Sequence, residues 1–336
     1  MNAAMPPEKQ KHFPVMIKQV LSIISPQHGG IYVDCTFGGG GYSKAILKHL
    51  NTKVIALDRD NITAHHAKEL KKKFPKRFDY FNSKFSNLDE VYKSNEKPKA
   101  IIFDLGISSL QLDDPERGFS FKSNKSINME MGLNKSSVYE AVNNLDKREL
   151  ANIIKILGDE KDAKNIANHI TSYRKKKTIN TSEELSFIIN KAKRNYSNKK
   201  NPATKTFQAL RIFVNEELSE LILGLIAATK ILSDGGYLIV VSFHSLEDKI
   251  VKYFFSLYSN LKNNPSRYFP LTENKSNLFT VKSKKPLTPE RKEIIFNHRS
   301  RSAKLRFAIR SNNKFFFPEE FVKKFEKFAK VERSIL

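Results

Sequence analysis

The stretch Asp34-Cys35-Thr36-Phe37-Gly38-Gly39-Gly40-Gly41-Tyr42-Ser43 follows an apolar run, residues 31–33, and precedes a helix-like pattern, residues 45–50. The predicted order is therefore strand, glycine turn, helix. Four consecutive glycines leave the backbone without side chains where the strand meets the helix. The chain can then turn tightly, and a ligand can lie against bare amides. This stretch predicts a site for a nucleotide-like cofactor.

The spacing of the glycines separates two classes of cofactor. A dinucleotide fingerprint, G-x-G-x-x-G, requires a third glycine where this chain has Ser43. Asp34 places a carboxylate four residues before Gly38, which repels a pyrophosphate and suits the ammonium of S-adenosylmethionine. Asp58 ends the next apolar run, residues 54–57, where a ribose would donate hydrogen bonds to it. The plainer alternative is a glycine turn beside two aspartates of no chemical use.

Apolar runs alternate with helix-like segments through the first part of the chain, as in a parallel sheet covered on both faces. The runs end at Asp34, Asp58 and Asp104, and a short strand ends near Phe85. Ligands of such sheets bind at the carboxyl ends of the strands. We therefore expect these four residues at one edge of the sheet.

The alternation stops at Asp113. Residues 113–132 are rich in Pro, Gly, Ser and Asn, and helix-like patterns follow at 136–144, 147–157, 159–173 and 182–195 without a strand between them. The predicted fold class is α/β, a Rossmann-like sheet with an inserted all-helical domain. The expected domains are a discontinuous sheet domain at 1–112 and 206–311, a helical RNA-recognition insert at 113–205, and a tail helix at 312–336.

The sheet pattern resumes after the insert. We expect a single long helix at 207–232, a strand at 237–241, a helix at 246–261 with Ser245 and Asp248 as its capping box, a strand at 302–309 and a helix at 319–331. His244 either faces the site or packs. Phe321, Phe325 and Phe328 share one face of the last helix, a pattern more typical of packing than of a site.

The chain is strongly basic, with 59 Lys and Arg against 35 Asp and Glu and a net charge of +24. Such an excess attracts polyphosphates and makes binding salt-dependent. A codon bias toward Lys explains part of it, but the shortage of acids favours a nucleic-acid partner over an anionic membrane. Basic runs at 174–177 and 191–200 border the helical insert. A charge run is usually a solvated face, and here we expect RNA contact.

Other features narrow the class of protein. The only cysteine, Cys35, excludes an intramolecular disulfide and fits a reducing compartment. Residues 1–13 lack the apolar core of a signal peptide, and the longest apolar run, 221–229, is too short to cross a bilayer. We expect a cytoplasmic protein without a membrane or an obligate protein partner. No metal cluster is expected, because His65-His66 lacks a Cys or carboxylate at ligand spacing.

Eight blocks carry a resemblance to a known family. The chain resembles the RsmH (MraW) family, the ribosomal RNA small-subunit methyltransferases H, from residue 12 to about residue 310. The blocks are 35–43, 57–60, 104–109, 111–113, 117–121, 202–204, 206–212 and 242–248. The later blocks are specific to this family, whereas the glycine loop is shared more widely.

The resemblance implies an enzyme that uses S-adenosylmethionine to methylate the N4 amine of a cytosine, position 1402 in customary numbering, in the decoding region of 16S rRNA of the small ribosomal subunit. The family's cofactor-contacting positions fall on Gly40, Gly41, Tyr42, Asp58, Phe85, Asp104 and Gln111. Three residues depart from the family pattern. Tyr42 stands in place of the usual His, Asn128 in place of Asp, and His298 in place of Pro.

The chemistry of this reaction adds further candidates. The N4 amine of cytosine is a poor nucleophile because its lone pair is delocalised into the ring, so a site must orient it and accept its protons. Asp104, Ser108 and Ser109 follow the fourth strand and are the candidate catalytic residues. The alternative for the two serines is a capping turn. Phe119 or Phe121 would either stack on a flipped cytosine or anchor a loop.

Two rival functions belong to other classes. A nicotinamide dehydrogenase would need the missing third glycine and has no use for a charge of +24. A non-catalytic RNA-binding or assembly protein with an inactive cofactor fold is the stronger rival, and it predicts RNA binding without methyl transfer.

Overall fold

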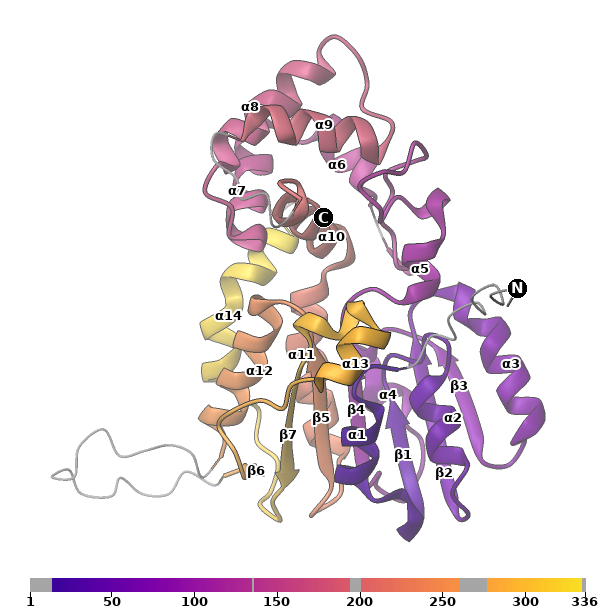
Figure 1. Cartoon of the computed structure of the whole chain (residues 1–336). Helices are drawn as coiled ribbons and strands as arrows, with labels where there is room; N and C mark the ends of the chain where they lie inside the picture. Colours follow the sequence, from indigo (N-terminus) through magenta and orange to yellow (C-terminus); the bar gives the residue numbers. More distant parts are fainter. Residues whose placement is uncertain (1–13, 135, 194–200, 260–276, 334–336) are drawn as a thin grey trace, which may run out of the picture.

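The computed structural model describes residues 14–134, 136–193, 201–259 and 277–333. A seven-stranded sheet in the order β3-β2-β1-β4-β5-β7-β6 forms its centre (Figure 1). Its strands are β1 (Gly30–Asp34), β2 (Thr52–Asp58), β3 (Phe78–Asn82), β4 (Ala100–Asp104), β5 (Tyr237–Ser242), β6 (Phe279–Thr280) and β7 (Lys304–Arg310). The first five strands are parallel, and β7 is antiparallel to both β5 and β6. The predicted α/β fold class is confirmed.

The strands are apolar on both faces because helices cover both. Side chains alternate along a strand, so Ile31 and Val33 enter one core while Tyr32 enters the other. One face is covered by α1 (Ile17–Ile24), α2 (Gly41–Leu47) and α3 (Ala64–Lys73). The other is covered by α4 (Leu88–Val91), α11 (Glu217–Ile231) and α12 (Ser245–Leu257).

Among the described residues, six α-helices lie between β4 and α11 in sequence. They are α5 (Ser109–Asp113), α6 (Val138–Asn144), α7 (Lys147–Gly158), α8 (Ala163–Arg174), α9 (Ser182–Ala192) and α10 (Thr204–Asn215). Figure 1 shows α6 to α9 beyond the carboxyl edge of the strands. Capping boxes begin four of them, at Ser108, Ser137, Asp146 and Thr181, where each cap pairs with a Gln or Glu three residues later. Polar caps therefore determine where these helices start.

The structure corrects two of the predicted helices around β5. The helix expected at 207–232 is two helices, because Glu216 has a left-handed backbone with φ of 51° between α10 and α11. This break lets α10 pack on α7 while α11 follows the sheet. The capping box of α12 is formed by His244 and Glu247 instead of Ser245 and Asp248, and the helix ends at Leu257.

Helices at the two ends of the described chain complete the fold. The sequence analysis did not predict α1, whose Val20 and Ile24 are buried against the sheet. In α14 (Glu319–Glu332), Phe321, Phe325 and Phe328 are buried, so the phenylalanine face packs as expected. Within the described ranges, no helix combines the length and apolar character needed to span a membrane.

Candidate cofactor and catalytic site

The glycine turn links β1 to α2 at the carboxyl edge of the sheet. Gly38 and Gly40 have φ of 51° and 76°, which L-residues with side chains rarely adopt. A Cβ on Gly40 would lie 2.8 Å from the ring of Phe37, whereas a Cβ on Gly39 would meet no atom within 4 Å. The turn therefore packs on one side and leaves bare backbone facing open space on the other.

Asp58 is held at the end of β2 by backbone amides. The Gly38 amide donates to Oδ2 at 2.7 Å, and the Asp60 amide donates to Oδ1 at 2.9 Å. A carboxylate oxygen accepts two hydrogen bonds, so both oxygens retain capacity for a further donor. Asp58 is thus oriented and still able to accept from the hydroxyls of a ribose.

Asp34 ends β1, directly before the glycine turn, and Asp104 ends the neighbouring parallel strand β4. The Ser43 hydroxyl donates to Asp34 Oδ2 at 2.6 Å, and the Asp104 amide donates to Thr36 Oγ1 at 2.7 Å. The buried Asp104 Oδ1 has no hydrogen-bond partner in the part of the chain that the structure describes. A buried polar atom without a partner is rare in a folded protein, and a donor on a ligand would satisfy it.

Burial and mutual repulsion disfavour the negative charges of the three carboxyl groups. Burial raises the pKa of Asp34 and of Asp58 to about 6, and it raises that of Asp104 well above its usual range, with the Asp34 charge adding to the effect. No Lys or Arg among the described residues forms an ion pair with any of them. A cationic ligand would compensate these charges. S-adenosylmethionine, with its ammonium and sulfonium, therefore fits the site.

Most of the chain matches a known protein family. The sequence profile of the MraW methylase family matches residues 9–311. The chain belongs to the MraW methylase family. It is a methyltransferase, and its cofactor is S-adenosylmethionine.

Relatives of this MraW-family chain include two proteins named ribosomal RNA small subunit methyltransferase H. The protein from Ehrlichia canis is 45% identical over 309 residues, covering 89% of this chain and 99% of the relative. The one from a Wolbachia of Drosophila simulans is 45% identical over 300 residues, covering 88% and 97%. An rRNA methylase structure from Streptococcus thermophilus is 12% identical with a TM-score of 0.38, covering 87% of this chain and 96% of that one. That score is low, so the fold assignment comes from the sheet itself.

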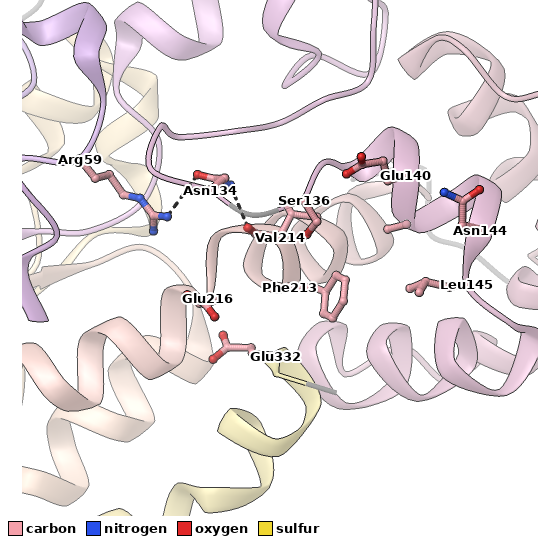
Figure 2. Close-up of a pocket in the computed structure, with 11 residues that line it drawn as sticks. Arg59, Asn134, Ser136, Glu140, Asn144, Leu145, Phe213, Val214, Glu216 and Glu332 are labelled. Atoms are coloured by element: carbon pink, nitrogen blue, oxygen red, sulfur yellow. Dashed lines mark hydrogen bonds between the residues drawn. The ribbon is translucent and has the colours of Figure 1, made fainter. Parts of the chain in front are cut away.

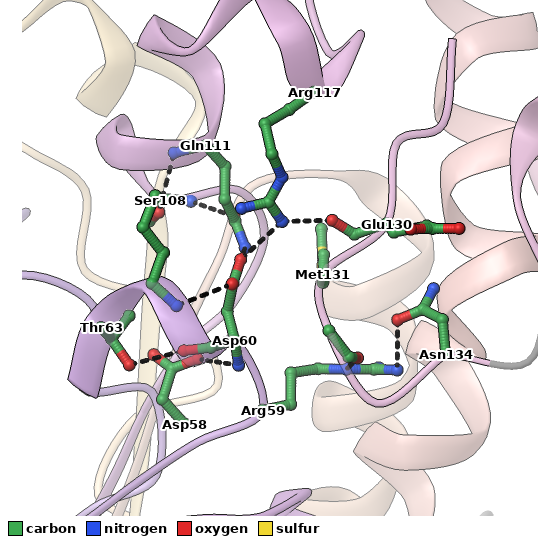
Figure 3. Close-up of polar contacts among 12 residues, drawn as sticks. Asp58, Arg59, Asp60, Thr63, Ser108, Gln111, Arg117, Glu130, Met131 and Asn134 are labelled. Carbon is green, nitrogen blue, oxygen red and sulfur yellow. Dashed lines mark hydrogen bonds and ion pairs between the residues drawn. The ribbon is translucent and has the colours of Figure 1, made fainter. Parts of the chain in front are cut away.

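Other predicted site residues of this methyltransferase lie around α5 (Figure 3). Ser108 caps α5, where its Oγ accepts from the Gln111 amide at 3.3 Å and its own amide donates to Gln111 Oε1 at 2.9 Å. Gln111 Nε2 donates to Asp60 Oδ2 at 2.7 Å. The capping alternative therefore describes Ser108, and both ends of the Gln111 amide group are engaged within the protein. Ser109 is half-buried beside them.

The side chains of Tyr42 and Phe85 pack against other parts of the protein. The buried Tyr42 hydroxyl donates to the Val15 carbonyl. The ring of Phe85 lies 5.2 Å from that of Phe103 and closely against Gly224 of α11. Only the backbone of Tyr42 remains for a cofactor contact, so its departure from the family's His affects packing against the N-terminal segment.

Sequence reasoning missed a network that joins β2 to the segment after β4. Arg117 pairs with Asp60 Oδ2 at 2.6 Å and also donates to the Glu130 carbonyl (Figure 3). Arg59 donates to the carbonyls of Gly132 at 3.1 Å and Asn215 at 2.6 Å. The two residues after Asp58 therefore attach the start of the inserted segment to the cofactor strand. The acid-base-acid order of residues 58–60 was visible in the sequence, but the distant partners were not.

The two loop phenylalanines, and several residues of the basic runs, make contacts within the protein that stabilise the fold. Phe119 is buried under the Arg117 guanidinium, and the ring of Phe121 packs 4.8 Å from that of Phe207. Both rings anchor their loop, as the alternative expectation held. Arg174 donates to two helix carbonyls, and Lys177 and Lys193 form ion pairs with Glu184 and Glu160. Residues 194–200 of the second basic run lie outside the described residues.

A cluster beside β5 has ligand atoms that lie within 4.8 Å of one another: Glu217, His244 and Glu247. Its cationic partners are already supplied by the chain. Arg211 pairs with both oxygens of Glu217 at 2.7 Å, and the Glu247 amide approaches His244 Nδ1 at 3.5 Å. His244 Nε2 lies 3.1 Å from Glu247 Oε1. These contacts suit a polar network better than a metal site.

A cavity of about 240 Å³ has none of the three aspartates in its lining (Figure 2). It is lined by Arg59 of the β2 end, by α6 and α10, and by Glu332 of α14. Arg59 bonds Asn134 across it at 3.2 Å, and Glu332 accepts from Ser219. Arg59, Asn134 and Glu332 of its lining therefore already have partners.

Proposed function

We propose that this chain is an rRNA methyltransferase that methylates the N4 amine of a cytosine in the decoding region of 16S rRNA, at position 1402 in customary numbering. The observation that carries the proposal is the set of three buried carboxyl groups at adjacent strand ends, with Asp104 Oδ1 lacking a partner among the described residues. Family membership and the names of the relatives support the choice of rRNA.

The cofactor would be held by the residues around the glycine turn. Asp58 accepts from the ribose, the backbone of Gly40, Gly41 and Tyr42 borders the donor, and Asp104 faces its charged end. Phe85 and Gln111 support these residues. Phe85 packs on Phe103, next to Asp104, and Gln111 donates to Asp60, close to Asp58. The bound cofactor supplies a methyl group activated by its sulfonium.

The substrate amine needs an acceptor for its protons. Asp104 Oδ1 is the strongest candidate, because it is buried, it has a free acceptor position within the described chain, and its raised pKa makes the carboxylate a stronger base than an ordinary aspartate. Ser109 is a second acceptor candidate, and Ser108 acts by capping α5. Orientation of the amine is the other contribution that the pocket makes.

The rRNA would be held mainly outside the cofactor pocket. We assign residues 1–112 and 206–311 to catalysis, 113–205 to RNA recognition and 312–336 to a tail whose helix α14 packs on both. The partner is 16S rRNA within the small ribosomal subunit, and no obligate protein partner is inferred.

The deciding experiment uses labelled S-adenosylmethionine with small ribosomal subunits and, separately, with naked 16S rRNA. Mass spectrometry of the digested nucleosides is expected to find N4-methylcytidine on one of the two substrates. Cofactor-independent binding to the subunits without any N4-methylcytidine would instead support the non-catalytic RNA-binding rival.

A further inference from the structure

We propose that residues 282–301, the basic aromatic surface, bind the single-stranded rRNA that flanks the target cytosine, with Phe296 stacking on a base. This inference rests on the proposed function and identifies a surface for it. The surface contains α13 (Arg291–Phe296) and the short 3-10 helix His298–Ser302 up to residue 301. Neither was assigned an RNA-binding role above.

The composition of the basic aromatic surface is unusual even for this chain. It carries seven basic residues, Lys282, Lys284, Lys285, Arg291, Lys292, Arg299 and Arg301, against only Glu290 and Glu293. All seven basic side chains are on exposed residues. Within the described part of the chain, only Arg299 of the seven forms an ion pair, with Asp113 at 2.6 Å. Six cationic side chains therefore remain available for phosphates.

Two large apolar side chains project from this basic segment. Phe296 is 78% exposed and Ile295 is 60% exposed. On a helix, residues four apart share a face, so Arg291 lies beside Ile295 and Lys292 lies beside Phe296. Cations that track a backbone, interleaved with an aromatic ring for stacking, are the combination by which proteins bind single-stranded nucleic acid.

The surface lies next to the candidate active site. Glu293 Oε1 accepts from the Met16 amide at 2.7 Å, and the Glu293 charge contributes to the raised pKa of both Asp104 and Tyr42. Arg299 reaches Asp113 at the end of α5. Figure 1 shows α13 over the carboxyl ends of the central strands. A strand of RNA with a nucleotide in the pocket would cross this surface.

The charge of the basic aromatic surface and its position beside the candidate active site favour single-stranded RNA over other anionic ligands. An anionic membrane would also attract the cations, but the surface borders a methyltransferase pocket, where the flanking substrate must lie. Stacking on Phe296 tolerates any base, so the surface would contribute affinity with little sequence preference.

The test measures fluorescence anisotropy of a labelled single-stranded RNA of about 12 nucleotides with the full-length protein. Phe296→Ala and Phe296→Leu are expected to weaken binding by roughly 5- to 100-fold, because both lose stacking, whereas Phe296→Tyr is expected to stay within about twofold. Phe317→Ala is the matched control. Phe317 is 54% exposed and follows β7, which ends at the opposite edge of the sheet. Cofactor affinity, measured by calorimetry, should be the same in all four variants.

The proposal is overturned if Phe296→Leu binds RNA as tightly as the unmodified chain, or if the protein binds phosphatidylglycerol vesicles more tightly than RNA through Phe296. Methyl transfer is scored separately. N4-methylcytidine formation together with unchanged RNA affinity and KM in Phe296→Ala would leave the function standing and remove this surface. Phe296-dependent RNA binding without methyl transfer would support the surface and remove the function.

Discussion

At the scale of single residues, Asp58 shows how the backbone prepares a side chain for a ligand. Two amides fix its carboxylate, and both oxygens keep acceptor capacity. We expect Asp58→Ala to weaken S-adenosylmethionine binding by about 10- to 100-fold, since a hydrogen bond to a charged group contributes about 1.5–3 kcal/mol. Isothermal titration calorimetry measures this change.

The control for that variant is Asp89→Ala. It removes a carboxylate of α4 that pairs with Lys230 of α11. It should leave cofactor affinity unchanged. Equal affinities of Asp58→Ala and the unmodified chain would mean that the ribose binds elsewhere.

The raised pKa values of the carboxyl groups predict how cofactor binding depends on pH. Asp34 and Asp58 have pKa values of about 6 in the free protein, and a cationic ligand binds their deprotonated forms. Cofactor affinity should therefore be constant above pH of about 7 and fall by up to about tenfold per pH unit below 6 for each carboxyl that must lose its proton. Calorimetry between about pH 5 and 8 tests this sign. An affinity that rises on acidification would contradict it.

At the scale of elements, Asp60 joins β2 to α5 and to the loop that follows it. In Asp60→Asn, the Arg117 guanidinium, whose side chain is 19% exposed, would lose its charged partner. We expect the free energy of unfolding to fall by about 1–3 kcal/mol. Amide hydrogen exchange should also become faster in residues 111–131.

Asp79→Asn is the comparison for this variant, because its ion pair with Lys71 is on the surface and should contribute less than about 1 kcal/mol. If exchange in residues 111–131 is the same in both variants, Asp60 does not hold this loop.

A second element-scale contact ties α14 to α11. The Glu332 carboxylate accepts from the amides of Leu218 at 2.9 Å and Ser219 at 2.8 Å, and so caps the start of α11 from another helix. Glu332→Ala should lower the free energy of unfolding by about 1–2 kcal/mol in urea titration, because these amides are buried and lose their acceptor. Glu326→Ala, on the exposed face of the same helix, should change it by less than about 0.5 kcal/mol.

At the scale of the whole molecule, the net charge of +24 should govern RNA affinity through counterion release. If about six cations contact phosphates, the logarithm of the association constant should fall with the logarithm of salt concentration with a slope of about −4. Arg291→Gln with Lys292→Gln should make that slope shallower by roughly 1.4. Anisotropy titrations at several salt concentrations measure it, and a slope near zero would exclude phosphate contact.

The features that could be predicted from the sequence are those determined by residues close together in the chain. The glycine turn, the apolar runs of β1, β2, β4 and β5, and the aspartates that end β1, β2 and β4 depend on residues that are neighbours in the chain. The family resemblance added the cofactor and the reaction, and the seven-stranded sheet agrees with the predicted fold class. The break at Glu216 was invisible, since an apolar pattern continues through a residue that adopts a left-handed backbone only because α10 and α11 pack on different partners.

What the sequence determined alone is the alternation of strands and helices in the sheet domain and the acidic edge of the sheet, because hydrophobic periodicity and turn residues act over short distances. Only the tertiary structure decided that Phe85, Tyr42 and the two loop phenylalanines pack inward, that Asp60 and Arg59 hold the inserted segment, and that α13 lies over the pocket. Those outcomes depend on contacts between residues up to hundreds of positions apart, whose pairing is set by the packing of whole elements.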